Sequence, residues 1–281
     1  MRKNNNGSHK YDAGVMQKIL QPIPAPVIYS IANVMPSSLN NSTEKFSVEV
    51  SEFAGTPTVE TKLVENFNLV NTGSNYREIS FKWVQEGATH TYQDLVDEGN
   101  GLYDRTGKQT AAAAVVEQGI DDFGMQTLTS DPNVITSVHT GPTWDKATGI
   151  ELEDSLIHQV MLHNLKTGIK ANKVVLDKEL MVYTSKARDN NGNKINLSEI
   201  LLNIEIEYVE KLRDSSDKPA YMIIDNRNNE NVKMLVIEPT NLCNTRPSKD
   251  NTGETDEFRA KVSEAYVARL GAVTLVEGVV A

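Results

Sequence analysis

The sequence predicts an α+β fold, in which strands and helices are mixed without a regular βαβ order or a sandwich pattern. Two observations carry this prediction. Parts of residues 45–84 and of the C-terminal region alternate between apolar and polar residues, whereas residues 108–128 repeat apolar residues at helical spacing. With 281 residues, of which 39% are hydrophobic and 23% charged, the chain is long enough for one large globular domain or two modest ones.

The overall charge and the cysteine content restrict the class of protein. A net charge of -10 repels phosphate at long range, and the sequence contains no run of Lys and Arg that would support general nucleic-acid binding. The single cysteine, Cys243, excludes an intrachain disulfide framework and fits a reducing compartment. Because no apolar stretch approaches the roughly 20 residues that cross a bilayer, and no signal peptide is visible, we expect synthesis in the cytoplasm and no membrane contact.

The N-terminal region is expected to form an arm. Its first ten residues, MRKNNNGSHK, are too polar to pack, so we expect a tip that is mobile or ordered by a partner. In the segment QPIPAPVIYSIANVMP, residues 21–36, three prolines fall within the five positions 22–26 and favour an extended path. The apolar residues of this arm must be buried on the same chain or on a neighbouring one, and they are Ile23, Val27, Ile28 and Ile31.

Two strands are predicted within residues 45–84. The apolar positions that alternate with polar ones are Phe46, Val48, Val50, Ile79, Phe81 and Trp83. The residues between the two strands are rich in Gly, Pro, Asn and Thr, which predicts a long two-stranded excursion rather than a tight hairpin. Such a ribbon is marginally stable alone, so we expect it to lie on a neighbouring subunit.

A long helix is predicted from about Lys108 to Leu128. Val116, Ile120 and Phe123 form an apolar stripe on one face of it. Gly119 and Gly124 each weaken such a helix by about 1 kcal/mol relative to Ala, which tertiary packing must offset.

Residues 130–149 are expected to form a connector, followed by a second helix at 151–167. Acidic residues begin this helix, Lys166 lies in its last turn and Gly168 is placed to cap it. Its expected buried face comprises Leu152, Leu156, Val160 and His163.

The remaining chain predicts a mixture of strands and short helices. A buried strand at 174–176 is followed by Asp177 as the N-cap of a short helix, and Asn196 with Glu199 has the spacing of a capping box. Residues 204–212 are expected to be a strand, and YMIIDNRNNENVKMLVIEP a hairpin around an Asn-rich turn. Near the C-terminus, residues 258–262 and 273–279 predict two further strands.

The sequence indicates no catalytic, cofactor-binding or metal-binding residues. It contains no G-x-S-x-G, G-x-G-x-x-G or G-x-x-x-x-G-K-[ST] motif. His158 and His163 lie about 140° apart on a helix, so they do not share a face as a zinc-binding pair would. Asp121 and Asp122 are adjacent on a helix and point in different directions, and no basic motif near Cys243 would activate its thiol.

The order of these elements resembles that of the major capsid proteins of tailed bacteriophages, a fold shared with encapsulin shells. The phrases that carry the resemblance are EISFKWVQEGATHTYQDLVDEGNG before the long helix, TGPTWDKATGIELEDSLIHQVMLHNLKTGIKANKVVLDKELMVYTSK after it, and FRAKVSEAYVARLGAVTLVEGVV near the end. The resemblance implies an N-terminal arm (1–44), an extended β loop or E-loop (45–90), a peripheral domain with a spine helix (91–144 and 255–270), and an axial domain (145–254 and 271–281).

The resemblance further implies a non-enzymatic shell subunit. It would assemble with itself into hexamers and pentamers that form an icosahedral virion capsid around double-stranded DNA, which it contacts non-specifically, in the host cytoplasm. The sequence lacks a long charged N-terminal coiled segment, so the resemblance implies either a separate scaffolding protein or removal of that segment, and the Met1 start favours the scaffold. A portal and a decoration protein are expected as further partners. Some family members crosslink a loop lysine to an asparagine; Lys62 lies in the expected loop, and no particular asparagine is indicated.

Three alternatives remain open from the sequence. An encapsulin-type compartment would have the same fold around a cargo enzyme. Another phage structural protein, such as a tail-tube or decoration protein, would explain the strands but not the long helix. An enzyme of unrecognised family would require a pocket with convergent polar groups, to which no motif points.

Overall fold

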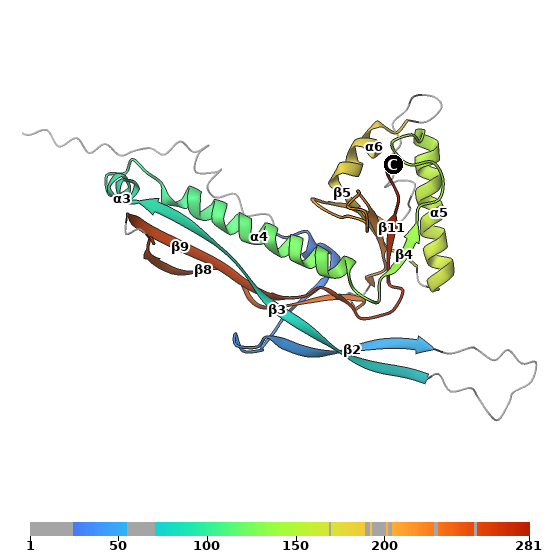
Figure 1. Ribbon diagram of the computed structural model, residues 1–281, viewed down its shortest axis with the longest axis horizontal. Helices are drawn as coiled ribbons and strands as arrows, with labels where there is room; N and C mark the ends of the chain where they lie inside the picture. Colours follow the sequence, from blue (N-terminus) through green and yellow to red (C-terminus); the bar gives the residue numbers. More distant parts are fainter. Residues whose placement is uncertain are drawn as a thin grey trace, which may run out of the picture.

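The computed structural model describes residues 25–54, 71–168, 170–188, 192, 201, 204–227, 230–249 and 252–281, and it has the α+β architecture that the sequence predicts (Figure 1). A long helix lies on a long, twisted sheet at one end of the molecule, and a second, smaller sheet with its own helices forms the other end. The expected capping box at Asn196 and Glu199, the N-terminal tip and Lys62 lie outside the described residues.

The larger sheet has six strands within the described residues, in the order β1-β8-β9-β3-β2, with β10 paired to β8. Both C-terminal strand predictions are confirmed, the first of them as β9. The strands are β1 (Asn33–Pro36), β2 (Lys45–Ala54), β3 (Asn71–Thr91), β8 (Val232–Pro247), β9 (Gly253–Ser263) and β10 (Tyr266–Val267).

The predicted pair of strands within 45–84 is confirmed, and strand β3 is longer than expected. Its first half pairs antiparallel with β2, from Asn71 opposite Ala54 to Ser80 opposite Lys45. Its second half pairs with β9, from Phe81 opposite Ser263 to Thr91 opposite Gly253. One continuous strand therefore belongs both to the sheet and to a two-stranded ribbon that projects from it (Figure 1).

The predicted long helix is observed as α4 (Arg105–Thr129), which begins three residues earlier than expected. Asp104 caps it, because its side chain accepts a hydrogen bond from the Thr106 backbone N–H. Val116 and Ile120 are buried against the larger sheet as predicted, while Phe123 is only partly buried. A shorter helix, α3 (Tyr92–Gly99), precedes α4 and was not predicted.

The two glycines of α4 lie at its closest contacts with other elements. A Cβ added at Gly119 would come within 2.7 Å of Val84 Cγ1 on β3, and one added at Gly124 within 2.7 Å of Ile28 Cγ1. Such separations are shorter than real Cβ contacts, so a methyl group at either position would force Val84 or Ile28 to shift. Packing against β3 and against the arm thus offsets the intrinsic cost of glycine in a helix.

The smaller sheet has the order β4-β11-β7-β5-β6 within the described residues. Strand β4 lies inside the expected connector 130–149, where it pairs in parallel with β11. The other four strands match the predicted runs. The strands are β4 (Ile135–Val138), β5 (Lys173–Asp177), β6 (Glu205–Val209), β7 (Tyr221–Ile224) and β11 (Val273–Glu277).

The helices of the smaller sheet confirm the capping predictions. Helix α5 (Gly149–Thr167) ends at Gly168, which has a φ of 66° and donates its backbone N–H to Asn164 O. Asp177 caps the 3₁₀-helix η1 (Lys178–Leu180), which continues into α6 (Met181–Lys186). The face of α5 that carries Leu156 and His163 is buried, as predicted.

The hairpin predicted for residues 221–239 is wrong. Strand β7 pairs with β5 and β11 in the smaller sheet, whereas β8 pairs with β1, β9 and β10 in the larger one. The Asn-rich segment redirects the chain between sheets, because Asn226 Oδ1 accepts the backbone N–H groups of Asn231 and Val232 at the start of β8. The expected axial range 145–254 accordingly contains strands of both sheets.

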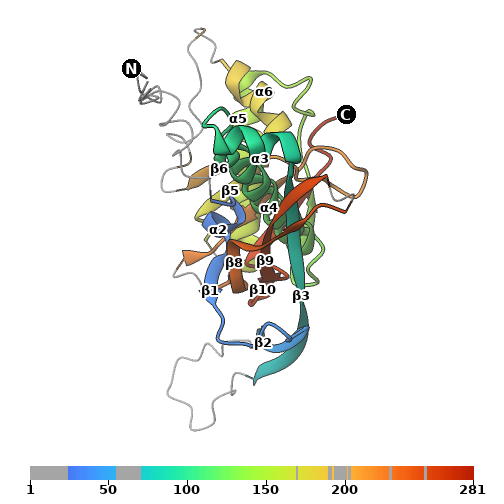
Figure 2. The same cartoon turned by 90° about the vertical axis from the view of Figure 1, so that its left-hand side faces the viewer.

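A single-turn helix of the arm, α2 (Ile28–Ile31), lies where the two sheets meet (Figure 2). Its first N–H, that of Ile28, donates to Asp121 on α4 at 2.7 Å. Its carbonyls accept from the smaller-sheet side: Lys173 Nζ donates to Ser30 O at 2.8 Å, and Asn226 Nδ2 donates to Ile31 O at 2.7 Å. Apolar burial accompanies these bonds, since Ile28 and Ile31 are fully buried.

We predict that Gly124→Ala lowers the free energy of unfolding by about 1–3 kcal/mol, because the new methyl group overlaps Ile28. Urea unfolding of the unassembled chain measures this change. Gly107→Ala is the matched control: it lies in the same helix with nothing within 4 Å of the added Cβ, so it should stabilise by about 0.5–1 kcal/mol. Equal effects of the two substitutions would contradict the contact.

Candidate functional site

The residues considered as catalytic or metal-binding candidates do not form a reaction centre. His158 is exposed on α5 while His163 is buried, so the two do not converge. Asp121 is engaged with the Ile28 N–H and Asp122 with Gln118, as expected of residues that point apart. In the part of the chain that the structure describes, no cluster of His, Cys, Asp and Glu could hold a metal ion, and no helix is long and apolar enough to span a membrane.

Cys243 is partly buried on β8, and its thiol donates to the Glu257 carbonyl at 3.2 Å. No catalytic partner is therefore needed to explain its position, and the features that stand out are structural. They are the projecting ribbon, the two ends of the long helix, and a groove beside the arm.

The β2–β3 ribbon leaves the body of the molecule and is the first candidate contact element (Figure 1). At its base, Val48, Val50 and Ile79 are buried in a small apolar cluster with residues of β8 and β10. On the other face of the ribbon, Tyr76 is 75% exposed opposite Glu49, which lies between Val48 and Val50. A two-stranded ribbon is marginal in water on its own, so contact with another surface would stabilise the part that projects beyond this cluster.

The base of the ribbon is fastened to the end of helix α4 by one carboxylate. Asp131, whose side chain is fully buried, forms an ion pair with Arg77 on β3. The same carboxylate accepts the backbone N–H of Val267 on β10 at 3.0 Å and that of Asn133 at 2.8 Å. The angle at which the ribbon leaves the body is therefore fixed by a charge-assisted junction rather than by apolar packing alone.

The other end of α4 is held by a second buried carboxylate, that of Asp256 on β9. Its oxygens accept from Arg105 Nε at 2.8 Å, Gln109 Nε2 at 2.8 Å and Thr245 Oγ1 at 2.6 Å. His90 Nε2 lies 3.1 Å away and acts as a donor, because an ionised carboxylate only accepts. Burial alone would raise the pKa of Asp256, but the hydrogen bonds from Thr245, Arg105 and Gln109 lower it to about 2.

The smaller sheet buries titratable side chains beneath α5. His163 is 2% exposed, and its Nδ1 lies 2.8 Å from Thr274 Oγ1 on β11. Burial lowers the pKa of His163 to about 4, although the Asp225 carboxylate acts in the opposite direction. On the outer face of the same helix, Met161 and Leu165 are 55% and 78% exposed, which provides a second candidate contact surface.

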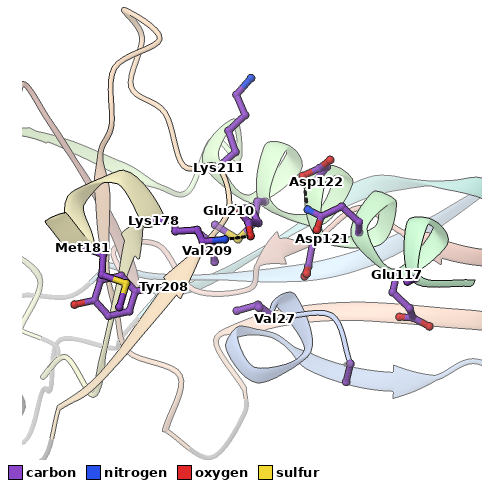
Figure 3. A pocket seen from close by; sticks show the side chains of 14 residues that line it. Val27, Glu117, Asp121, Asp122, Lys178, Met181, Tyr208, Val209, Glu210 and Lys211 are labelled. Carbon is purple, nitrogen blue, oxygen red and sulfur yellow. Dashed lines mark hydrogen bonds and ion pairs between the residues drawn. The ribbon is translucent and has the colours of Figure 1, made fainter. Parts of the chain in front are cut away.

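A groove of about 400 Å³ separates α4 from β6 and α6, with the arm along one side (Figure 3). Carboxylates of α4 line one wall, and Lys178, Met181 and Tyr208 line the other. The groove does not gather a nucleophile, a base and an oxyanion donor in the way that a hydrolytic site would. Sequence reasoning missed it because its walls come from four separate segments of the chain.

Solved structures with this architecture include a phage capsid and a virus-like particle. The chain superposes on the capsid of Myoviridae phage XM1 with a TM-score of 0.64 and 13% identity, covering 91% of this chain and 93% of that one. A structure from Mycobacterium phage Cain gives 0.63 and 10% identity, with 96% and 94% covered, and a virus-like particle from Pyrococcus furiosus gives 0.61 and 12%, with 88% and 90% covered. No protein-family model and no curated protein matches the sequence.

The chain therefore has the fold of phage capsid proteins, as the order of its elements predicted. The similarity covers about nine-tenths or more of this chain and of each compared chain. It therefore concerns the overall architecture and not a single element.

We predict that Asp256→Asn lowers the free energy of unfolding by roughly 2 kcal/mol at pH 7. Since the pKa of this carboxyl is lowered on folding, the difference from the natural chain should persist above about pH 4 and disappear as the pH falls toward 2. Urea unfolding over this pH range measures it. Glu254→Gln is the control: that side chain also pairs with Arg105 but is 42% exposed, so its loss should cost less than about 1 kcal/mol.

A second prediction concerns His163, which is neutral in the folded state. Because its pKa is lowered from 6.5 to about 4, stability is lost as the pH falls through this interval, by roughly 2 kcal/mol between pH 7 and pH 5. His163→Gln should reduce that loss in urea-unfolding experiments. His158→Gln, which changes an exposed histidine of the same helix, should leave it unchanged; identical pH dependence of the two variants would refute the assignment.

Proposed function

We propose that this protein is the shell-forming subunit of a bacteriophage-type capsid and acts by assembling with copies of itself. The observation that carries the proposal is the likeness to the capsid of phage XM1 over 91% of this chain and 93% of that one. The exposed ribbon supports it independently, since a two-stranded extension that buries little of its own surface is suited to a neighbouring subunit. Its role is structural rather than catalytic.

The finer proposal is that the subunits form hexamers and pentamers that close an icosahedral shell around double-stranded DNA, in a virion assembled in the host cytoplasm. Rotation-related contacts between unlike surfaces generate such rings, and small variations in them allow rings of five and six. The net charge of -10 agrees with non-specific, weak contact to the packaged DNA. A scaffolding protein, a portal and a decoration protein are the further partners proposed.

We propose region boundaries that follow the two sheets, which differ from the boundaries expected from the sequence. We assign the N-terminal arm to 1–44, the extended loop to the β2–β3 ribbon, and the peripheral domain to α4 with the larger sheet, including β8 (Val232–Pro247). The axial domain then comprises the smaller sheet with α5 and α6.

An encapsulin-type compartment is the second candidate, and the likeness to a virus-like particle from Pyrococcus furiosus supports it. The two candidates share the subunit fold and differ in contents. Proteins that co-purify with the shell distinguish them, because a compartment retains a cargo enzyme and a virion precursor retains scaffold and portal.

The first experiment is size-exclusion chromatography of the purified chain, alone and with candidate scaffold, followed by electron microscopy of the earliest peak. Closed shells, rings or tubes are the expected result. A species that stays monomeric or dimeric at all concentrations and with every scaffold would contradict the proposal and favour an enzyme of another family.

We predict that Tyr76→Glu abolishes shell formation, because it places a charge on the exposed side of the ribbon where a neighbour must be contacted. The free energy of unfolding of the single subunit should change by less than about 0.5 kcal/mol, as expected for a 75% exposed side chain. Tyr76→Phe, which keeps the ring, should still assemble. Particle counts by electron microscopy give the comparison, and normal shells from Tyr76→Glu would rule out this contact.

A further inference from the structure

The groove beside the arm combines apolar surface with an excess of negative charge (Figure 3). Met125 and Val209 contribute apolar lining. Four carboxylates line the groove against two ammonium groups, and these six residues are Glu117, Asp121, Asp122, Glu210, Lys178 and Lys211. A ligand that suits this lining has apolar side chains and a net positive charge.

Three of these four carboxylates already have a partner within the subunit, and Asp122 accepts from Gln118. Asp121 is already bonded to the Ile28 N–H, and Glu210 is paired with Lys178. The fourth, Glu117, has one enclosed oxygen; burial raises the pKa of this carboxyl, the Thr240 side chain lowers it and the nearby Asp121 raises it, and the net shift is upward.

The groove lies where the described part of the arm begins. Ala25 and Val27 themselves line it, so residues 1–24 are covalently tethered at the groove. Those residues, 1–24, contain four Lys or Arg and one Asp, hence a charge of +3. Since the whole chain carries -10, the remainder carries -13, and the N-terminal segment is the oppositely charged part of the molecule.

The same segment also provides apolar residues. Val15, Met16, Ile19 and Leu20 surround Lys18 in the stretch VMQKIL. From Ala25, an extended chain reaches about 3.4 Å per residue, so Lys18 lies within roughly 24 Å of the groove entrance. Both features of the groove therefore have a counterpart in residues that are tethered next to it, which gives them a high local concentration.

We propose that residues 1–24 bind in the groove of their own subunit, with Lys18 beside the carboxylates of Glu117 and Asp122 and the neighbouring apolar residues against Met125 and Met181. This binding concerns the single subunit and goes beyond shell formation. It gives the basic segment a defined place before assembly, and because charge contributes to it, added salt weakens it.

Disulfide trapping in dilute, unassembled subunits tests the proposal. In a Cys243→Ser background, Gln21→Cys is combined with Met181→Cys or with Gln118→Cys, both at positions that line the groove. Mild oxidation should give a crosslinked product of monomer mass for at least one pair. Gln21→Cys with Leu165→Cys is the control, because Leu165 lies on the outer face of α5 and should not crosslink.

The possible outcomes separate the alternatives. A product of dimer mass would mean that a second copy supplies the segment, which overturns binding within one subunit. Absence of crosslinking for both groove pairs would overturn the site altogether. Neither result bears on whether assembled chains form shells, which is measured separately by electron microscopy.

A charge exchange tests the electrostatic part. Lys18→Glu and Asp122→Lys should each slow crosslinking by about threefold, and the double variant should restore it to about the natural rate. Asp154→Lys, which changes the same charge at an exposed position of α5, should have no effect. Failure of the double variant to recover would contradict the pairing of Lys18 with Asp122.

Discussion

The rest of the structure depends on one short piece of the arm, the single turn α2, which joins the two sheets. Its N–H end bonds to Asp121 on the long helix, and its carbonyl end accepts from Lys173 and Asn226 on the smaller-sheet side. The side chains of Ile28 and Ile31 are buried in one apolar cluster that continues from α4 into β7 and β11. This turn therefore adds directed hydrogen bonds to the apolar contact between the two ends of the molecule.

The close approach of α2 explains why the long helix has an unfavourable composition. Gly119 and Gly124 reduce helix propensity, yet a methyl group at either position would overlap β3 or the arm. The helix is therefore stabilised by its packing against β3 and α2. Buried carboxylates hold both of its ends, Asp256 near the N-terminus and Asp131 beyond the C-terminus. The ribbon is connected to the end of α4, because Arg77 at the ribbon base forms an ion pair with the same Asp131.

Local sequence signals predicted most elements, while contacts between distant segments were not visible in them. Alternation located β2 and β9, helical spacing located α4, and Gly168 and Asp177 marked caps correctly, since all of these depend on near neighbours. The hairpin at 221–239 was wrong because Asn226, besides its local bonds to the start of β8, bonds to the arm almost 200 residues away in sequence, a contact that local patterns do not reveal. Helix α3 had a readable signal that was overlooked, the capping box formed by Thr91 and Asp94. The groove had none, since its charges converge only after folding.

The arrangement divides the molecule into a closed interior and surfaces left open for contact. Polar groups in the interior are mostly paired, as in the cluster around Asp256, and this closes the body to further partners. Strand β2, in contrast, is an edge of the larger sheet in the part of the chain that is described, and an exposed edge is a template for pairing with other chains. Proteins that remain single normally protect such an edge, so a long unprotected one is consistent with selection for association. Its isolation on a projecting ribbon limits where that association occurs, because the body from which the ribbon projects presents an acidic surface that repels its own copies unless specific contacts compensate.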